Sequence, residues 1–386
     1  MTAPTSSSPA LARLIDRVRH AQRQGERLVI QGGGSKRFYG SAPPQASGLD
    51  TRELSGIVSY EPSELVVTAR AGTPLAELEA ALAAQGQYLP FEPPHFAGDG
   101  PGRATVGGMV AAGLSGPGRA SAGAVRDYML GVAVVDGRGQ WLQFGGQVMK
   151  NVAGYDVSRL MAGSLGALGV IAEVSLKVLP RPVAQATLAF ALPQQAALDA
   201  LNRWGGQPLP LQASVWHGGR LLLRLAGARA AVEAATALLA RQYPAEVVGA
   251  DDAQTAWQDW REQRVQALQA QPGEALWRLS VPQTAPAVAW PMAQGEPAIE
   301  WHGAQRWVHA PVDAAEALRS QAAALGGHAT LFRAAAAPAT ASVPVFHPQP
   351  AALARIQARL RQAFDPDGVF AGGHLGLADV DERAAV

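Results

Sequence analysis

The chain has 386 residues, of which 48% are hydrophobic and 16% charged. A chain of this length and composition is expected to form more than one core, so we predict a globular protein of two domains. Its 32 basic and 31 acidic residues give a net charge of +1 without a Lys/Arg stripe, which argues against nucleic-acid binding. The absence of cysteine excludes disulfides, thiolate nucleophiles and iron–sulfur clusters bound through cysteine.

The N-terminal segment, Met1 to Ala10, is rich in Ser, Thr and Pro. It lacks the basic start and the apolar run of a secretory signal. No stretch of the sequence is apolar over the length that a membrane-spanning helix needs. We therefore expect a cytoplasmic protein, and peripheral attachment to the inner membrane through a partner is left open.

The first half of the chain alternates short helices and strands. Apolar residues at helical spacing predict a helix over Leu11 to Gln24. Strands are predicted at Leu28 to Ile30, Gly56 to Tyr60 and Leu65 to Arg70. A second helix is then expected to have Thr73 as its N-cap, Pro74 in its first turn and Gly86 at its end.

Further along, Met109 to Leu114 is predicted as a short helix. Met129 to Val135 and Gln140 to Phe144 are predicted as a hairpin, and Val170 to Leu179 as a strand. Residues 183–335 are rich in Ala, Leu and Trp and are expected to form a second α+β domain. In the last segment, 336–386, a helix is predicted over Pro350 to Phe364, packing back on the first domain.

Two glycine-rich stretches carry the strongest indication of function. One, Gln31-Gly32-Gly33-Gly34-Ser35-Lys36, directly follows a strand, and the other begins with Thr105-Val106-Gly107-Gly108. Consecutive backbone N–H groups in such loops bind anions, and the dipole at the N-terminus of a helix adds to the attraction. Two such anion-binding loops suit the diphosphate of a dinucleotide.

A nicotinamide-binding Rossmann turn is the obvious alternative. That motif requires a helix immediately after its glycines and an acidic residue about 20 residues further on. The residues after Gly34, including Pro43 and Pro44, predict a loop without an amphipathic helix. The sequence therefore argues against the nicotinamide alternative, whereas an ordinary glycine-rich turn would be favoured if the first stretch stood alone.

Several further segments, in order and spacing, resemble the FAD-binding domain of the vanillyl-alcohol oxidase and p-cresol methylhydroxylase type. Besides the two glycine-rich stretches, the resemblance rests on Ala124-Val125-Arg126-Asp127, Lys150-Asn151-Val152-Ala153-Gly154-Tyr155-Asp156 and Gly163-Ser164-Leu165-Gly166-Ala167-Leu168-Gly169. The second domain resembles that of the FAD-binding subunits of bacterial glycolate oxidases, in Trp277-Arg278-Leu279-Ser280 and Gly326-Gly327-His328-Ala329-Thr330-Leu331-Phe332-Arg333. The resemblance implies an α+β fold: a two-subdomain FAD-binding domain over 1–182, an α+β cap domain over 183–335, and the C-terminal helix and tail.

The resemblance also implies which residues bind the cofactor. One set of residues is expected to bind the diphosphate through backbone groups: Gln31, Gly32, Gly33, Gly34, Ser35, Thr105, Gly107 and Gly108. Arg126 and Asp127 are expected along the flavin or its ribityl arm. The loop with Gly163, Ser164, Gly166 and Gly169 is expected close to the cofactor, with the backbone of Val170 at its adenine end, although a tight helix-to-strand turn explains these glycines equally well.

The expected FAD is non-covalent, because the chain has no cysteine and no histidine in the first glycine-rich stretch. His95, near the second stretch, is expected to be a loop residue and not an attachment point. Glu300, His302 and His309 form the nearest cluster of metal-ligand types. Alternation along a strand would separate His309 from the other two, so no metal site is predicted.

Arg278, Arg306 and Arg333 are candidates for holding a substrate carboxylate. The chain lacks the His-x-Gly-Asp-Gly-Asn-x-His segment usual in related D-2-hydroxy-acid dehydrogenases, and we identify no catalytic base. The resemblance therefore implies a subunit of a glycolate oxidase complex with a related catalytic flavoprotein and an iron–sulfur subunit as partners. Two alternatives stay open: a self-sufficient FAD oxidoreductase of another small hydroxy acid or alcohol, and a structural subunit with weak or no FAD.

Overall fold

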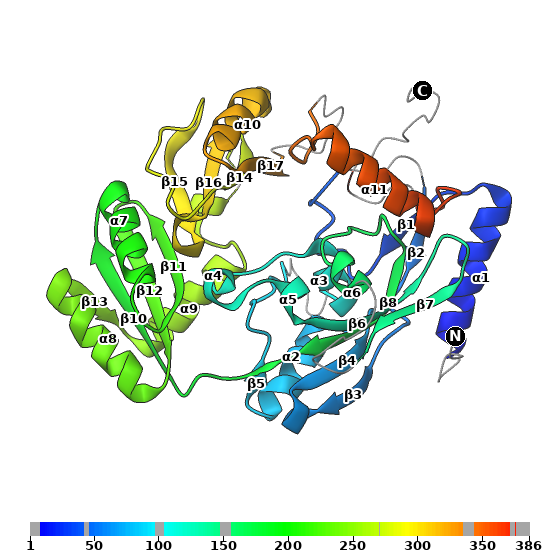
Figure 1. Ribbon diagram of the computed structural model, residues 1–386, viewed down its shortest axis with the longest axis horizontal. Helices are drawn as coiled ribbons and strands as arrows, with labels where there is room; N and C mark the ends of the chain where they lie inside the picture. Colours follow the sequence, from blue (N-terminus) through cyan, green and yellow to red (C-terminus); the bar gives the residue numbers. More distant parts are fainter. Residues whose placement is uncertain are drawn as a thin grey trace.

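The computed structural model describes residues 8–41, 46–96, 104–146, 156–269, 271–334, 343–370 and 375. Two large sheets dominate it, and Figure 1 shows the smaller one on the right and the larger one on the left. The chain passes from the first sheet to the second between Lys177 and Ala184. The predicted segments Lys150 to Tyr155 and Ala371 to His374 lie outside the described residues.

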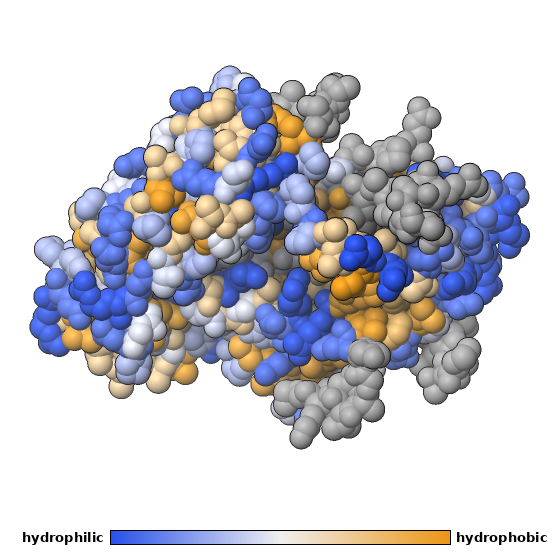
Figure 2. All heavy atoms as spheres, turned by 45° about the horizontal axis from the view of Figure 1, so that its top comes forward, coloured by the Kyte–Doolittle hydropathy of each residue, from blue (hydrophilic) through white to orange (hydrophobic). Residues whose placement is uncertain are grey.

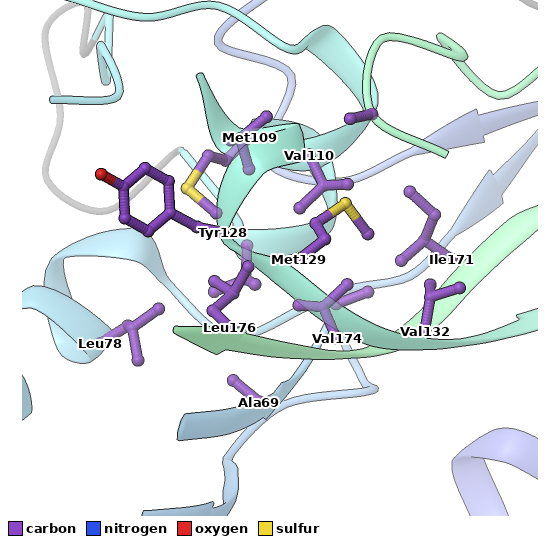
Figure 3. Packing of buried hydrophobic residues seen from close by; sticks show 14 of the residues in the cluster. Ala69, Leu78, Met109, Val110, Tyr128, Met129, Val132, Ile171, Val174 and Leu176 are labelled. Atoms are coloured by element: carbon purple, nitrogen blue, oxygen red, sulfur yellow. The ribbon is translucent and has the colours of Figure 1, made fainter. Parts of the chain in front are cut away.

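The first sheet has five antiparallel strands in the order β3-β4-β8-β6-β7. Their bounds are β3 Ile57–Glu61, β4 Val66–Arg70, β6 Met129–Val135, β7 Trp141–Gly145 and β8 Val170–Lys177. Helices α2 (Leu75–Ala84) and α3 (Val106–Ala112) pack on this sheet. In Figure 3, Met109 and Val110 of α3 face Met129 and Val174 of the strands, because the apolar residues of each element share one face.

A smaller layer holds the start of the chain against this domain. The strands β1 (Leu28–Gln31) and β2 (Ser47–Asp50) pair in parallel, and α1 (Pro9–Gln24) buries Leu11, Leu14 and Val18 beside them. The short pair β5 (Gln87–Tyr88) and β9 (Leu179–Pro180) closes the other end. The remaining short elements here are η1 Pro62–Glu64, α4 Arg119–Ala122, α5 Val125–Tyr128 and α6 Val157–Leu160.

The second sheet has eight strands in the order β13-β10-β12-β11-β15-β16-β14-β17. Their bounds are β10 Ala184–Ala191, β11 Leu211–His217, β12 Arg220–Gly227, β13 Ala245–Val248, β14 Ala275–Ser280, β15 Gln294–Glu300, β16 Gln305–Ala310 and β17 His328–Arg333. The helical elements of this half are α7 Gln194–Gly205, α8 Arg229–Gln242, α9 Ala250–Arg261, η2 Gln266–Leu268, η3 Trp301–Gly303, η4 Val312–Ala314 and α10 Ala315–Ala324. Helices α7, α8 and α10 cover one face, while α9 lies with Tyr39 and Leu114 of the first half on the other.

The last helix, α11 (Ala351–Phe364), returns to the first half of the molecule, as Figure 1 shows. Its Phe364 ring lies 6.1 Å from the ring of Phe144 on β7, between centroids. Beyond the helix, the Val369 carbonyl accepts a hydrogen bond of 2.7 Å from the N–H of Leu28, and Phe370 is buried against α1. These contacts join residues 351–370 to the first half.

Most of the predicted elements are confirmed, within one to three residues at their ends. The predicted N-cap Thr73 is wrong: α2 begins after Pro74, and the Thr73 hydroxyl instead accepts from the Gly56 N–H at 3.0 Å and donates to the Gly56 carbonyl at 3.1 Å. That pair ties the start of α2 to the segment that enters β3, a contact between residues distant in sequence.

The surface drawn in Figure 2 is mainly hydrophilic, with apolar residues in separate patches. Among the helices of the described chain, none combines the length and apolar character needed to span a bilayer.

Candidate functional site

A cavity of about 470 Å³ lies between the two glycine-rich stretches. Its volume is within the range typical of cofactor sites. The predicted cofactor residues that line it are Gln31, Gly32, Gly33, Gly34, Ser35, Thr105, Gly107, Gly108, Gly166 and Gly169. Three loops that are remote in sequence therefore meet around one space.

The absence of side chains on the glycines is what allows these loops to meet. A Cβ on Gly32 would lie 2.4 Å from Oγ1 of Thr105, and a Cβ on Gly107 would lie 2.6 Å from Cβ of Ala71. Real Cβ atoms essentially never make contacts this short, so any side chain would push the loops apart. Glycine at these two positions is required by the close approach of backbone to its neighbours.

The first stretch presents unused backbone donors to the cavity. No described residue accepts a hydrogen bond from the N–H groups of Gly32, Gly33, Gly34 or Ser35. These N–H groups follow the end of β1, where the chain leaves the β1–β2 pair. A run of unpaired N–H groups beside a cavity suits an anion such as a diphosphate.

The second stretch is different, and here the sequence-based prediction needs correction. The N–H of Gly107 donates to the Ala71 carbonyl at 2.7 Å, and the N–H of Gly108 donates to Oγ1 of Thr105 at 3.2 Å. These donors are already used to hold α3 in place, so they do not complete a ring of free N–H groups. Thr105, Gly107 and Gly108 instead shape the wall of the cavity.

Lys36 is a lining residue that the sequence-based site omitted. Its Nζ lies 3.3 Å from Oγ of Ser35 and 3.5 Å from the carbonyl of His95, and 5.6 Å from the ring centre of Phe96. Burial lowers the pKa of Lys36 to about 8, while Glu262 opposes that shift and Arg261 adds to it. A cation directly after a glycine-rich turn is the pattern of phosphate-binding loops, and that signal could have identified it.

Other lining residues missed by the sequence analysis include Thr51, Tyr39 and Ala111. Thr51 donates through its hydroxyl to the Gln31 carbonyl at 3.1 Å, and the Gln31 side chain accepts from the Arg37 guanidinium. These contacts fix the peptide that enters the first stretch. No local motif surrounds these residues, because the contacts come from separate parts of the fold.

Five predicted residues do not line the cavity: Arg126, Asp127, Gly163, Ser164 and Val170. Arg126 and Asp127 are exposed, and the Asp127 carboxylate accepts from the Ala124 N–H at 2.8 Å; their position along the flavin or its ribityl arm stays a prediction. The Val170 side chain is buried in the core beside α1. Ser164 lies next to the lining residues, and its buried Oγ has no partner among the described residues.

On the cap side, aromatic rings enclose two of the predicted arginines. The Arg278 guanidinium donates to the Tyr39 hydroxyl at 2.9 Å and lies 5.6 Å from the ring centre of Phe332. Arg333 lies 4.4 Å from the ring centre of Phe38 and donates to Oε1 of Gln263 at 3.3 Å. The structure thus brings Arg278 and Arg333 together on the face of the second sheet that meets the first half.

The prediction that Arg306 binds a carboxylate is wrong. Its side chain is completely buried on the opposite face of the sheet, and its guanidinium donates to the carbonyls of Ala285, Pro286 and Gly303 at 2.5, 2.6 and 3.3 Å. Burial lowers the pKa of Arg306 to about 10. The residue holds these backbone segments in place.

Glu300 is a buried carboxyl beside Arg278. Its Oε2 accepts from Nε2 of Gln305 at 2.9 Å and from Nε1 of Trp307 at 2.5 Å. Burial raises the pKa of Glu300 to about 7, against these two hydrogen bonds. The space that Glu300 and Arg278 line together is only about 10 Å³, which is room for about one water molecule.

The histidines near the site make local contacts. Glu300 ends β15, and His302 lies in the following 3₁₀ turn, with Nδ1 2.9 Å from Oγ of Ser214, so the two do not alternate along one strand as expected. His95 pairs with Glu79 at 2.9 Å, away from the cavity lining. Within the described ranges, no three His, Asp or Glu side chains are arranged to hold a metal ion.

The residues of the cavity fit an FAD diphosphate: unpaired N–H groups, a lysine at their end and glycines that leave room. Residues 11–145 match the family model for an FAD binding domain, so the fold and the cavity define an FAD-binding flavoprotein. A solved structure of alkyldihydroxyacetonephosphate synthase has the same fold, with a TM-score of 0.64 at 15% identity over 96% of this chain and 76% of that one.

Sequence comparison identifies the family to which the chain belongs among FAD-binding flavoproteins. The chain is 44% identical to the glycolate oxidase subunit GlcE of Escherichia coli (strain K12), over 94% of this chain and 96% of that protein. It therefore belongs to the GlcE family of glycolate oxidase subunits. Two partial matches are the glycolate oxidase subunit GlcD of Bacillus subtilis (29% identical, 42% of this chain and 33% of that one) and a D-lactate dehydrogenase of Anaerostipes hadrus (32%, 40% and 30%).

Proposed function

We propose that this chain is the FAD-binding subunit of a glycolate oxidase complex that oxidises glycolate to glyoxylate. In this proposal residues 1–182 bind FAD, residues 183–335 form the cap domain and residues 336–386 pack back on the FAD domain. The two electrons from glycolate pass to an iron–sulfur partner subunit. A related flavoprotein subunit carries the substrate chemistry.

One observation supports the proposal that another subunit carries the substrate chemistry. The space next to Arg278 and Glu300, on the side of the second domain, is nearly closed. Arg278 is bonded to Tyr39, Arg333 is bonded to Gln263, and the void beside Glu300 is too small for a two-carbon acid. Aromatic rings flank both guanidinium groups, and the void beside Arg278 has no room for glycolate. The described residues therefore support cofactor binding better than binding of glycolate.

The cofactor would be held by backbone and by one cation. The N–H groups of Gly32 to Ser35 would donate to the diphosphate, and Lys36 would neutralise part of its charge. Ser164 Oγ offers a further unused hydroxyl next to the cavity. Bound FAD supplies a two-electron acceptor, and the chain contributes its position and the surrounding charge.

The test is the visible spectrum of the purified chain, alone and co-expressed with its partner subunits, before and after anaerobic glycolate. We expect flavin absorption in the isolated chain that glycolate does not bleach, and bleaching once the partners are present. Bleaching of the isolated chain would identify a self-sufficient oxidoreductase instead. A folded chain without flavin, even at excess FAD, would favour a structural subunit.

A further inference from the structure

A second and larger cavity, of about 790 Å³, lies between the two halves of the molecule. Its walls come from α2, β5 and the following loop on one side and from β10 to β13 and α9 on the other. It shares no lining residue with the FAD cavity. It is also lined largely by polar side chains, whereas the FAD cavity is lined mainly by backbone and small residues.

The guanidinium groups around this cavity are not all paired. Three guanidinium groups, those of Arg181, Arg224 and Arg261, face two carboxylates, those of Glu79 and Glu92. Both carboxylates already accept hydrogen bonds from other residues. Glu92 accepts from Arg224 at 2.5 Å and from the Gly118 N–H at 2.7 Å.

Glu79 is occupied in the same way, since it accepts from Arg261 at 2.7 Å and pairs with His95 at 2.9 Å. Arg181 is exposed at the mouth of the cavity and pairs with no carboxylate of the described chain. Arg261 also pairs with Glu262, outside the cavity lining, at 3.3 Å. Arg181 is therefore the lining guanidinium that has no carboxylate partner among the described residues, and an anionic ligand would give it one.

Two buried polar atoms in the wall are unsatisfied. Arg224 is 6% exposed, and while its Nη2 donates to Glu92, its buried Nε has no acceptor among the described residues. The guanidinium lies 4.8 Å from the ring centre of Trp257, which fixes its plane. The buried Oε1 of Gln212 likewise lacks a donor in the described part of the chain.

Such groups are costly unless something pairs with them, so they indicate what is missing. Nε of Arg224 lacks an acceptor, and Oε1 of Gln212 lacks a donor, while the Gln212 side chain is also hydrogen-bonded to Tyr88. Burial raises the pKa of Tyr88, and Arg224 and Arg181 both oppose that rise, so both guanidinium groups act on the same region of the cavity. The amides of Gln254 and Gln258 add further donors and acceptors to this wall.

We propose that this cavity is a second ligand site, which binds a small hydroxylated carboxylic acid. The carboxylate lies between Nε of Arg224 and the guanidinium of Arg181, and the hydroxyl donates to Oε1 of Gln212. The ligand contacts both halves of the molecule, because Tyr88 and Arg224 come from different sheets. The site is separate from the FAD cavity and does not depend on the substrate of the complex.

Calorimetric titration of the full-length, FAD-loaded chain with L-malate tests the proposal, with succinate as the matched acid without the hydroxyl. We expect one saturable site for malate and at least about fivefold weaker binding of succinate, since a lost hydrogen bond costs about 1 kcal/mol. The flavin spectrum is expected to stay unchanged, because the acid does not enter the FAD cavity.

Variants locate the site. Arg181→Gln changes an exposed residue, and Arg224→Gln with Glu92→Gln removes a charge pair together, so that no buried charge is left alone. Each is expected to weaken malate binding at least tenfold. Arg220→Gln is the control, because Arg220 lies on the same strand, β12, with an exposed side chain outside the cavity.

Three results would overturn the proposal. The first is a malate titration that does not saturate at about 10 mM, where a site of millimolar affinity would fill. The second is equal weakening of malate binding by Arg220→Gln and Arg181→Gln. The third is bleaching of the flavin by malate. Equal affinity for malate and succinate would show that the ligand hydroxyl makes no contact with Gln212. That result would also count against the assigned ligand class.

Discussion

Gly32 and Thr105 approach so closely that a Cβ on Gly32 would lie 2.4 Å from Oγ1 of Thr105. That one contact joins the loop after β1 to the start of α3. The same Thr105 hydroxyl accepts from the Gly108 N–H at 3.2 Å, so it cannot turn away without uncapping the helix. The shape of the FAD cavity therefore depends on this pair, which lines it.

Gly32→Ala is therefore expected to weaken FAD binding at least tenfold, measured as flavin absorption per protein and by titration with FAD. The added methyl group displaces the loop whose N–H groups face the cavity. Gly205→Ala is the control, because no atom lies within 4 Å of a Cβ there. Adding Thr105→Ala to Gly32→Ala removes the 2.4 Å contact and is expected to restore part of the affinity. Equal FAD binding by Gly32→Ala and wild type would contradict the assignment.

Lys36 is expected to make FAD affinity depend on pH. With a pKa of about 8 in the free protein, Lys36 is charged at pH 7 and loses its proton as the pH rises through 8. The diphosphate favours the charged form, so FAD affinity is constant below pH 8 and falls above it. Lys36→Met is expected to bind FAD more weakly at pH 7 and without this fall.

Lys177→Met, on β8 and outside the cavity, is the matched control for Lys36→Met. A fall of the same size above pH 8 in Lys36→Met would assign the titration to another group. The folded chain without FAD gives an independent check: Lys36 has a lower pKa folded than its usual 10.5, so the free energy of unfolding should rise between pH 8 and 10.5 in wild type only.

Arg306→Met is expected to destabilise the chain without a specific effect on FAD. The change leaves three carbonyls without their donor in a fully buried place, at a cost of about 3 kcal/mol. Thermal unfolding measures it, with Arg220→Met as the exposed control. A melting temperature within about 1 °C of wild type would show that the carbonyl contacts are not needed.

Glu300→Gln is expected to remove a pH dependence of stability. The pKa of Glu300 is about 7 when folded, against an ordinary value of 4.5. Between pH 4.5 and 7 the folded chain keeps a proton that the unfolded chain has released, so the free energy of unfolding falls as the pH rises through this window. The loss is complete above pH 7 and is on the order of 3 kcal/mol.

Urea unfolding of wild type and Glu300→Gln at pH 5 and pH 8 checks this. Glutamine keeps an oxygen for Trp307 and Gln305 but carries no charge, so the variant should gain stability relative to wild type at pH 8 and little at pH 5. An identical difference at both pH values would mean that Glu300 is not the group that titrates.

Local sequence was enough to define the elements and the first half of the cofactor site. Short-range rules place the strand Leu28 to Gln31, the glycines that follow it and the short helix after Thr105. The two glycine-rich stretches predicted a dinucleotide, and the resemblance of the ordered motifs to a known FAD-binding domain implied that it is FAD.

Long-range packing determines which polar groups are free. The N–H of Gly107 donates to the carbonyl of Ala71, a residue of another segment, and nothing in the local sequence predicts that partner. The arginines make the same point. On the paired strands β14 and β16, Arg278 lies opposite Trp307, whereas Arg306 lies opposite Leu279.

A step of one residue along a strand moves a side chain to the other face of the sheet. Arg278 therefore meets the first half of the molecule, and Arg306 shares with Leu279 the face that α10 covers. Each arginine stands next to a tryptophan in the sequence, so the local sequence could not separate them. The register between strands is a long-range property, and it decided which arginine meets the FAD-binding half and which one only supports the fold.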